Sequence, residues 1–238
     1  MKNMKIVLII AIVMVFAVTA QGQYTPGKVT GGGTISGMVS YDGTAPKLKA
    51  LRIEKDKKVC ALHDKFKEDL IVDAKGGLRN VVVYIETIET GKAWDKKYTL
   101  DQKGCRFEPH IMIVGAGEKL SILNSDKILH NLHTYSKINP SMNKAQPKFK
   151  KRMSAKFAKA EFIRLRCDVH AWMSGWIVSS ANPYYAVTDD SGNFSISDVP
   201  AGTYTLKYWH ETLGEQSVEV TLTGGGTARS DAKFSPKS

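Results

Sequence analysis

Short runs of alternating apolar and polar residues cover most of the chain, and Gly, Asp, Asn and Pro residues separate them. The runs are rich in β-branched and aromatic side chains, which favour strands, and their spacing is typical of antiparallel sandwiches. They read "TISGMVSYDG", "NVVVYIETIETG", "EKLSILNSD", "EFIRLRC", "GWIVSS", "NFSISDV", "TYTLKYW" and "QSVEVTLTGGG". The pattern predicts an all-β protein built from Greek-key β-sandwiches.

Helical periodicity is weak by comparison. Two segments leave room for a helix, residues 46–66 and residues 142–159, and neither shows a continuous apolar face. We therefore expect little helix anywhere in the mature chain.

The first twenty residues differ from the rest. Two lysines precede an apolar run from Ile6 to Val18, and small residues follow up to Ala20. The run is too short to span a bilayer comfortably and has the order of a secretory signal peptide, residues 1–20. The Gly-rich residues 21–33 are typical of a linker. We expect a periplasmic or extracellular protein; the alternative is an uncleaved anchor that contacts the membrane.

Positive charge is in excess. The formal net charge is +11, and it falls to +9 if Lys2 and Lys5 leave with the signal peptide. No nucleic-acid-binding motif accompanies the charge, so an acidic partner or an anionic surface is the better match. Cations concentrate in residues 142–159, which is either a solvated loop or a surface that docks an acidic redox partner. The expected docking residues are Lys148, Lys150, Lys151 and Arg152.

The chain has three cysteines, an odd number for an exported protein. A disulfide between Cys60 and Cys105 leaves Cys167 as a single thiol with a different task. Free thiols are a liability in an oxidising compartment unless a metal ion binds them. The alternative is that all three cysteines are unpaired, with Cys167 a small buried apolar residue.

The stretch "RCDVHAWMSGW", residues 166–176, is the strongest chemical signal. Cys167, His170 and Met173 supply a thiolate, an imidazole and a thioether from one turn between two strands. Electron-transfer copper sites use these ligand types with a second imidazole, which must come from earlier in the chain. Trp172 and Trp176 are then expected to flank the site and shield it from water. Core packing of Met173 between the two tryptophans is the alternative.

Three stretches, two before the middle of the chain and one after it, resemble the carboxypeptidase regulatory-like, or transthyretin-like, β-sandwich family. These are "VTDDSGNFSISDVPAGTYTLKYWH" and the pair "GTISGMVSYDG" and "LRNVVVYIE". The resemblance implies one small sandwich split into residues 34–95 and 183–238, with a second domain, residues 96–182, inserted between them. Two tandem domains with a boundary near Pro183 are the alternative.

The middle of the chain is similar to the cupredoxins, the plastocyanin-like blue copper proteins. The similar segments are "GAGEKLSILNSDKILHN", "KAEFIRLRCDVHAWM" and "GWIVSS", and they cover about residues 98–180. The resemblance implies a cupredoxin-like domain that binds one copper ion. It assigns Asn131 to the support of the ligand loops. The ligands that it implies are His130, Cys167, His170 and Met173.

Two features leave the ligand set open. The His-x2-Met gap resembles binuclear copper A centres, but residues 163 and 171 are Ile and Ala rather than a second cysteine, so a mononuclear site is favoured. His133 and His110 are alternative ligands that would replace Met173 or His130. On a strand, His130 and His133 would face opposite sides, which argues against both binding one metal. Zinc is the rival metal.

These observations predict an exported copper protein that transfers one electron at a time. No Ser–His–Asp order, paired-carboxylate motif or Gly-rich phosphate loop supports hydrolase chemistry, so we expect an electron-transfer or binding protein rather than an enzyme. The alternative is a module that binds or delivers copper, or mediates adhesion, without a redox role.

Overall fold

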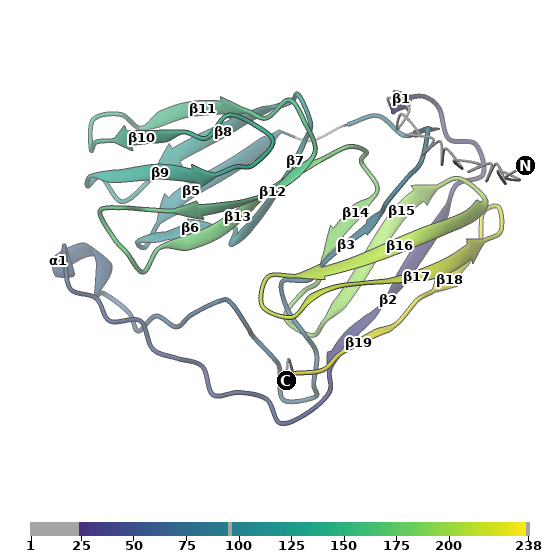
Figure 1. Ribbon diagram of the computed structural model, residues 1–238, viewed down its shortest axis with the longest axis horizontal. Helices are drawn as coiled ribbons and strands as arrows, with labels where there is room; N and C mark the ends of the chain where they lie inside the picture. Colours follow the sequence, from purple (N-terminus) through teal and green to yellow (C-terminus); the bar gives the residue numbers. More distant parts are fainter. Residues whose placement is uncertain (1–23, 95–96, 237–238) are drawn as a thin grey trace, which may run out of the picture.

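The computed structural model describes residues 24–94 and 97–236, whose regular secondary structure is almost entirely β-strand (Figure 1). The expected signal peptide, residues 1–20, lies outside the described residues. The one α-helix among them, α1 (Lys57–Cys60), is a single turn. The strands are β1 (Thr25–Pro26), β2 (Gly33–Tyr41), β3 (Val82–Ile85), β4 (Thr90–Gly91), β5 (Tyr98–Lys103), β6 (Arg106–Glu108), β7 (Ile111–Gly115), β8 (Lys119–Asn124), β9 (His130–Tyr135), β10 (Asn143–Gln146), β11 (Arg152–Lys156), β12 (Glu161–Arg166), β13 (Ser174–Ser180), β14 (Tyr185–Val187), β15 (Asn193–Val199), β16 (Gly202–His210), β17 (Gly214–Leu222), β18 (Thr227–Arg229) and β19 (Ala232–Phe234).

Two sandwiches contain all of these strands except β1 and β4, which pair with each other (Figure 1). Sandwich A, built from β5 to β13, has one sheet ordered β10-β9-β12-β13-β7 and another ordered β11-β8-β5-β6. Sandwich B has one sheet ordered β14-β3-β16-β17 and another ordered β15-β2-β18, with β19 also paired to β2. The all-β prediction is therefore confirmed, and strands from the two ends of the chain share the sheets of sandwich B.

Alternation along each strand sorts side chains between core and surface. On β8, Leu120, Ile122 and Asn124 point into sandwich A while the residues between them are less buried. On β12, Ile163 and Leu165 do the same from the facing sheet. The basic segment 142–159 follows the same rule: it forms β10, a turn and β11, so it contains no helix.

A third apolar cluster joins the sandwiches. Ile111, Ile113 and Val178 of sandwich A pack there with Val82 of sandwich B, and aromatic side chains from both surround them. Trp176 and Trp209 meet edge to face across this cluster, with ring centroids 4.8 Å apart. The outer face of the sheet that contains β12 and β13 is thus partly covered by sandwich B.

The connection from β2 to β3 runs outside both sandwiches and carries α1 to the end of sandwich A (Figure 1). We call residues 49–67 of this connection the strap. Its base is pinched by backbone hydrogen bonds from Leu51 N to Lys65 O (2.7 Å) and from Lys67 N to Lys49 O (2.9 Å). Within the described residues, no helix is long and apolar enough to cross a membrane.

Candidate metal centre

Two loops at one end of sandwich A bring the predicted ligands together. His130 is the first residue of β9, directly after the loop that leaves β8. Cys167 follows the last residue of β12, and His170 lies in the turn that leads to β13. Backbone hydrogen bonds from Cys167 N to Met173 O (3.3 Å) and from Met173 N to His170 O (2.9 Å) close that turn. The turn therefore presents Cys167 and His170 to the same point.

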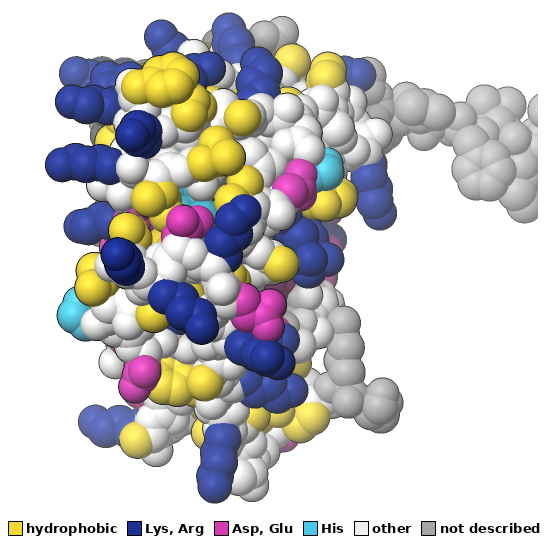
Figure 2. Space-filling view, turned by 90° about the vertical axis from the view of Figure 1, so that its left-hand side faces the viewer, with side chains coloured by type: hydrophobic (Ala, Val, Ile, Leu, Met, Phe, Trp, Pro, Cys, Tyr) yellow, Lys and Arg dark blue, Asp and Glu magenta, His cyan; other side chains and the backbone are white. Residues whose placement is uncertain are grey.

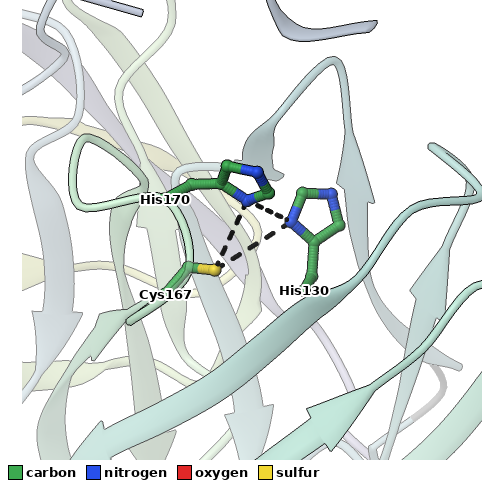
Figure 3. A group of neighbouring side chains, drawn as sticks. All are labelled: His130, Cys167 and His170. Carbon is green, nitrogen blue, oxygen red and sulfur yellow. Dashed lines mark hydrogen bonds between the residues drawn. The ribbon is translucent and has the colours of Figure 1, made fainter. Parts of the chain in front are cut away.

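The three donor atoms converge (Figure 3). Sγ of Cys167 lies 3.7 Å from Nδ1 of His170 and 3.9 Å from Nδ1 of His130, and the two Nδ1 atoms are 3.0 Å apart. All three side chains are buried. A trigonal site with metal–nitrogen bonds of about 2.0 Å and a metal–sulfur bond of about 2.3 Å separates its donors by roughly 3.5 to 3.7 Å. The sulfur–nitrogen distances match this spacing, and the two nitrogens lie somewhat closer.

The protonation of the group favours a cation at its centre. Burial alone would raise the pKa of the Cys167 thiol, but hydrogen bonds with His130 and His170, and with the backbone at Asn131 and His170, lower it to about 6. A thiolate then faces two ring nitrogens, and two neutral nitrogen acceptors at 3.0 Å repel each other. A proton or a metal ion between them relieves this repulsion, and thiolate with imidazole is a donor set for copper or zinc.

In each histidine, the ring nitrogen that points away from Cys167 contacts a carboxylate that the sequence analysis did not identify. Nε2 of His130 lies 2.9 Å from Oδ2 of Asp126, and Nε2 of His170 lies 2.8 Å from Oδ2 of Asp56. Carboxylate–histidine–metal arrangements of this kind fix the ring orientation of metal ligands. Asp126 could have been suspected, because it lies four residues before His130 in the loop. Asp56 could not, because only the fold of the strap brings it to His170.

Asp126 is itself anchored. Its carboxylate accepts hydrogen bonds from the backbone N–H groups of Gly104 (2.6 Å) and Cys105 (2.7 Å). Burial alone would raise its pKa, but the hydrogen bonds with His130 and with these two backbone groups lower the pKa below the usual range for aspartate. The structure also places Asp126 near the sulfur of Cys105, but that sulfur is bonded to Cys60 and is not a free thiolate.

Asn131 ties the two ligand loops together. Its Oδ1 accepts a hydrogen bond from the backbone N–H of Asp168 (2.6 Å), and its Nδ2 donates to Oδ2 of Asp168 (3.1 Å) and to Oδ1 of Asn143 (2.6 Å). The residue after His130 therefore positions the residue after Cys167. This is the role that the sequence resemblance implied for Asn131.

Trp172 lies beside the converging donors, and Met173 lies in the same turn. The ring of Trp172 is 5.0 Å from that of His170, and its Nε1 donates to the carbonyl oxygen of Cys105 (3.3 Å). Met173 is buried in the core of sandwich A together with Cys167.

Trp176 does not flank the site, so that prediction is wrong. It packs in the cluster between the sandwiches and donates from Nε1 to Oε2 of Glu211 (2.8 Å). The reason is the alternation of β13: its neighbours Gly175 and Ile177 are buried in the core, so Trp176 faces the opposite side of the sheet.

The two alternative histidines are engaged elsewhere. Nδ1 of His133 lies 3.0 Å from Oδ1 of Asp168, and its ring stacks on that of Tyr135 on the open face of the sheet. His110 is buried beside the interface of the two sandwiches, where its Nε2 contacts Glu211 and its Nδ1 lies 3.8 Å from Oε2 of Glu68. Neither belongs to the group of converging donors.

Exposed cations surround the loop end of sandwich A. The turn from β10 to β11 carries Lys148, Lys150 and Lys151, all exposed, and Arg152 follows at the start of β11. Between them Phe149 is 81% exposed. Figure 2, which views the side on the left of Figure 1, shows Lys and Arg side chains spread over this face, where they outnumber the acidic ones between them.

Comparisons with known proteins give partial matches. Residues 156–230 match the family description "Polysaccharide lyase family 4, domain II". The match covers less than half of the chain and runs from the end of β11 to β18, so it straddles both sandwiches. No carboxypeptidase regulatory-like domain was found, and that resemblance stays a prediction. No curated protein sequence matches the chain significantly.

Similar solved structures include a cupredoxin, an amicyanin mutant and a copper-containing nitrite reductase. A novel purple cupredoxin from Nitrosopumilus maritimus is 14% identical, with a TM-score of 0.31, and the overlap covers 35% of this chain and 100% of that one. A mutant of amicyanin in its oxidized state is 20% identical, with a TM-score of 0.33, covering 37% and 86%. A copper-containing nitrite reductase from Thermus scotoductus SA-01 is 18% identical, with a TM-score of 0.31, covering 40% and 25%. TM-scores this low carry no argument about the metal centre, which is therefore judged from the distances and burial of its own residues.

Proposed function

We propose that this protein is an exported, cupredoxin-like protein that transfers one electron at a time through one mononuclear copper ion. The observation that carries the proposal is the convergence of Cys167, His130 and His170, with donor atoms 3.0 to 3.9 Å apart in a buried pocket. A soft thiolate with two imidazoles is the equatorial ligand set of electron-transfer copper sites, where the metal supplies the Cu(I)/Cu(II) couple.

The chain contributes rigidity and the exclusion of water. His130 and His170 are fully buried and Cys167 is 1% exposed, so neither solvent nor a substrate reaches the donors. Asn131, Asp56 and Asp126 hold the ligand loops and rings from outside. Electron transfer requires that the ligand geometry change little. A buried site whose ligands are fixed by hydrogen bonds therefore suits electron transfer better than catalysis at an open coordination position.

Met173 would be the fourth residue to hold the copper ion. It is buried in the same turn as Cys167 and His170, and its thioether is the ligand type expected in that position. His133 and His110 remain with Asp168, Glu68 and Glu211, which supports Met173 as the fourth ligand.

The strand pairing supports a split arrangement of domains. We propose that residues 96–182 are a cupredoxin-like domain inserted in a sandwich formed by residues 34–95 and 183–238, because β2 and β3 share sheets with β14 to β19. Export to the periplasm or the extracellular space rests on the signal-like residues 1–20 of the sequence.

The partner is proposed to be an acidic redox protein. Lys148, Lys150, Lys151 and Arg152 lie at the loop end of sandwich A that also carries His130, and the exposed Phe149 adds an apolar contact. Opposite charge accelerates encounter and makes the association rate fall as salt rises. Reversal of Lys150 and Lys151 to Glu should therefore slow electron exchange with an acidic partner at low salt while the copper spectrum is unchanged.

The experiment is a titration of the mature protein with Cu(II), followed by visible absorption, EPR and a reductive titration. We expect one equivalent of copper, an intense thiolate-to-copper absorption band and a reversible one-electron wave. Uptake without reversible reduction would favour the alternative, a copper-binding or delivery module. Preferential binding of zinc with no copper absorption would contradict the proposal.

A further inference from the structure

The strap brings a carboxylate to the metal ligands by an unusual route. Asp56 stands at the N-terminus of α1 with φ of 48°, in the left-handed region, and its carbonyl oxygen accepts hydrogen bonds from the N–H groups of Val59 and Cys60 (both 2.9 Å). An aspartate at this position ordinarily caps the helix with its side chain. Here the side chain makes no capping hydrogen bond and instead contacts Nε2 of His170 at 2.8 Å.

A disulfide fastens this arm to the second carboxylate. Cys60, the last residue of α1, is bonded to Cys105, and the N–H of Cys105 donates to Asp126, the partner of His130. The carbonyl oxygen of Cys105 accepts a hydrogen bond from Nε1 of Trp172, in the ligand turn. Cys105 thus contacts Asp126 directly, and its disulfide links it to the helix that begins beside Asp56.

The strap has a second tie at the same place. Nζ of Lys65 is buried and donates to the carbonyl oxygens of Cys60 and, at 3.2 Å, His63. Together with the pinched base, this leaves α1 as a small closed unit that contacts sandwich A through the disulfide, through Asp56 and through the apolar side chains of Ile53 and Val59. A cover that merely filled space would not need a carboxylate aimed at a ring nitrogen.

We propose that Asp56 and Asp126 are positioning residues for the two histidines, and that the Cys60–Cys105 disulfide keeps Asp56 in place. An ionised carboxylate only accepts hydrogen bonds, so each Nε2 must carry the proton. The Nδ1 of each ring is then the nitrogen directed at Cys167, where a metal ion or, in its absence, a shared proton lies between the two rings. This inference rests on the proposed function only in that the group binds metal; the choice of tautomer is a property of the metal-free protein.

The first experiment reads the tautomers directly. Long-range ¹H–¹⁵N NMR of the metal-free, full mature chain distinguishes protonation at Nδ1 from protonation at Nε2. We expect Nε2–H on His130 and His170 in the wild type. Asp56→Asn should shift His170 toward a mixture of tautomers and leave His130 unchanged, and Asp126→Asn should do the reverse. Asp56→Glu should restore part of the wild-type signal.

Glu54→Gln is the matched control. Glu54 lies two residues before Asp56 on the same strap, and its carboxylate is exposed and paired only with the exposed Arg52 among the described residues. The control should leave both histidine signals unchanged. If Asp56→Asn behaves like Glu54→Gln, Asp56 does not position His170 and the inference is overturned.

Metal affinity gives the second readout. Loss of such an outer partner typically costs about 10–100-fold in affinity, so we expect a loss of that size for Cu(I) in Asp56→Asn and in Asp126→Asn. If the wild type binds no copper while the tautomers still respond as described, the proposed function fails and the positioning role stands. If copper binds normally and the tautomers do not respond, the positioning role fails alone.

The disulfide is tested with the double variant Cys60→Ala/Cys105→Ala. We expect the His170 signal to change as in Asp56→Asn, while His130 keeps its signal because the turn at Gly104 and Cys105 still holds Asp126. Equal changes at both histidines, or none, would contradict the assigned role of the disulfide. Circular dichroism checks that the double variant folds; if it does not, Asp56→Asn with the intact disulfide still tests the positioning role.

Discussion

Two buried histidine clusters, both beside the β2–β3 connection, contain similar residues and differ in geometry. In the candidate metal centre, His130 and His170 each turn one nitrogen to a carboxylate and the other toward Cys167. At the interface of the sandwiches, the single ring of His110 contacts Glu211 through Nε2 and lies 3.8 Å from Glu68 through Nδ1. We call the group of His110, Glu68 and Glu211 the interface cluster.

The comparison shows that residue types alone do not define a metal site. In the interface cluster both ring nitrogens face carboxylates, so no pair of donors is directed at one point. The cluster joins the β2–β3 connection, through Glu68, with β7 of sandwich A and the turn of sandwich B that holds Glu211. The interface cluster therefore links three parts of the chain that are far apart in sequence, and we expect it to contribute to stability.

Removal of the thiolate should have the largest effect. Structural zinc sites with four ligands bind with about 10–16 kcal/mol, or about 2.5 to 4 kcal/mol for each ligand, so Cys167→Ser should weaken copper binding by roughly 100- to 1,000-fold. The thiolate-to-copper absorption should vanish, as measured by titration in the visible range. His110→Gln is the comparison: it should bind copper as the wild type does, and a matching loss there would erase the distinction between the clusters.

Breaking the interface cluster should affect stability instead. Glu211→Ala leaves the buried His110 ring and the indole N–H of Trp176 without their carboxylate partner, and the loss of one partner of a buried pair costs about 3 kcal/mol. The free energy of unfolding in urea should fall by about that amount. The copper spectrum should not change, and a changed spectrum would show that the clusters are coupled.

The interface cluster should also give stability a dependence on pH. Burial alone would raise the pKa of Glu211, but the hydrogen bond and charge of His110, the indole of Trp176 and the charge of His210 lower the pKa below the usual value. A lowered pKa in the folded state gives stability that is present above the ordinary glutamate pKa of about 4.3 and is lost as pH falls through the folded value. The difference in unfolding free energy between wild type and Glu211→Gln should therefore shrink as pH falls from about 7 to about 3. A difference that is constant over this range would contradict the assignment.

A smaller effect is expected at Asn131. Asn131→Ala removes the hydrogen bond to the backbone of Asp168, which should cost about 1 kcal/mol of stability and about tenfold in copper affinity. Calorimetry of unfolding and of copper binding measures the two losses. Asn143→Ala, which changes only the exposed end of the same network, is the control and should have the lesser effect.

The smallest expected effect is a difference in fluorescence quenching between Trp172 and Trp176. Copper bound at the candidate centre should quench Trp172, whose ring is 5.0 Å from that of His170, more than Trp176, which packs on Trp209. Trp172→Phe should remove more of the copper-dependent quenching of fluorescence than Trp176→Phe. The reverse order would place the metal elsewhere.

Much of sandwich A could be predicted from local sequence. Alternation marks β8 and β12 as strands with one buried face, and turn residues separate them from their neighbours. Cys167, His170 and Met173 lie within seven residues, so their proximity needs only one tight turn. The approach of His130 follows from the family resemblance, which also assigned Asn131 its role.

The remaining features depend on contacts between residues far apart in the chain. Asp56 reaches His170 across a sequence separation of 114 residues, and nothing in the composition of the strap indicates it. The sequence left His110 as an alternative metal ligand to His130. Only the structure shows that His110, just before β7, is engaged by Glu211, which belongs to the other sandwich. Trp176 lies close to the ligands in sequence, yet the two-residue period of β13 turns it to the opposite face. Local pattern therefore determined the strands and the ligand turn, while the packing of strap, sheets and sandwiches decided which polar groups meet in the buried space.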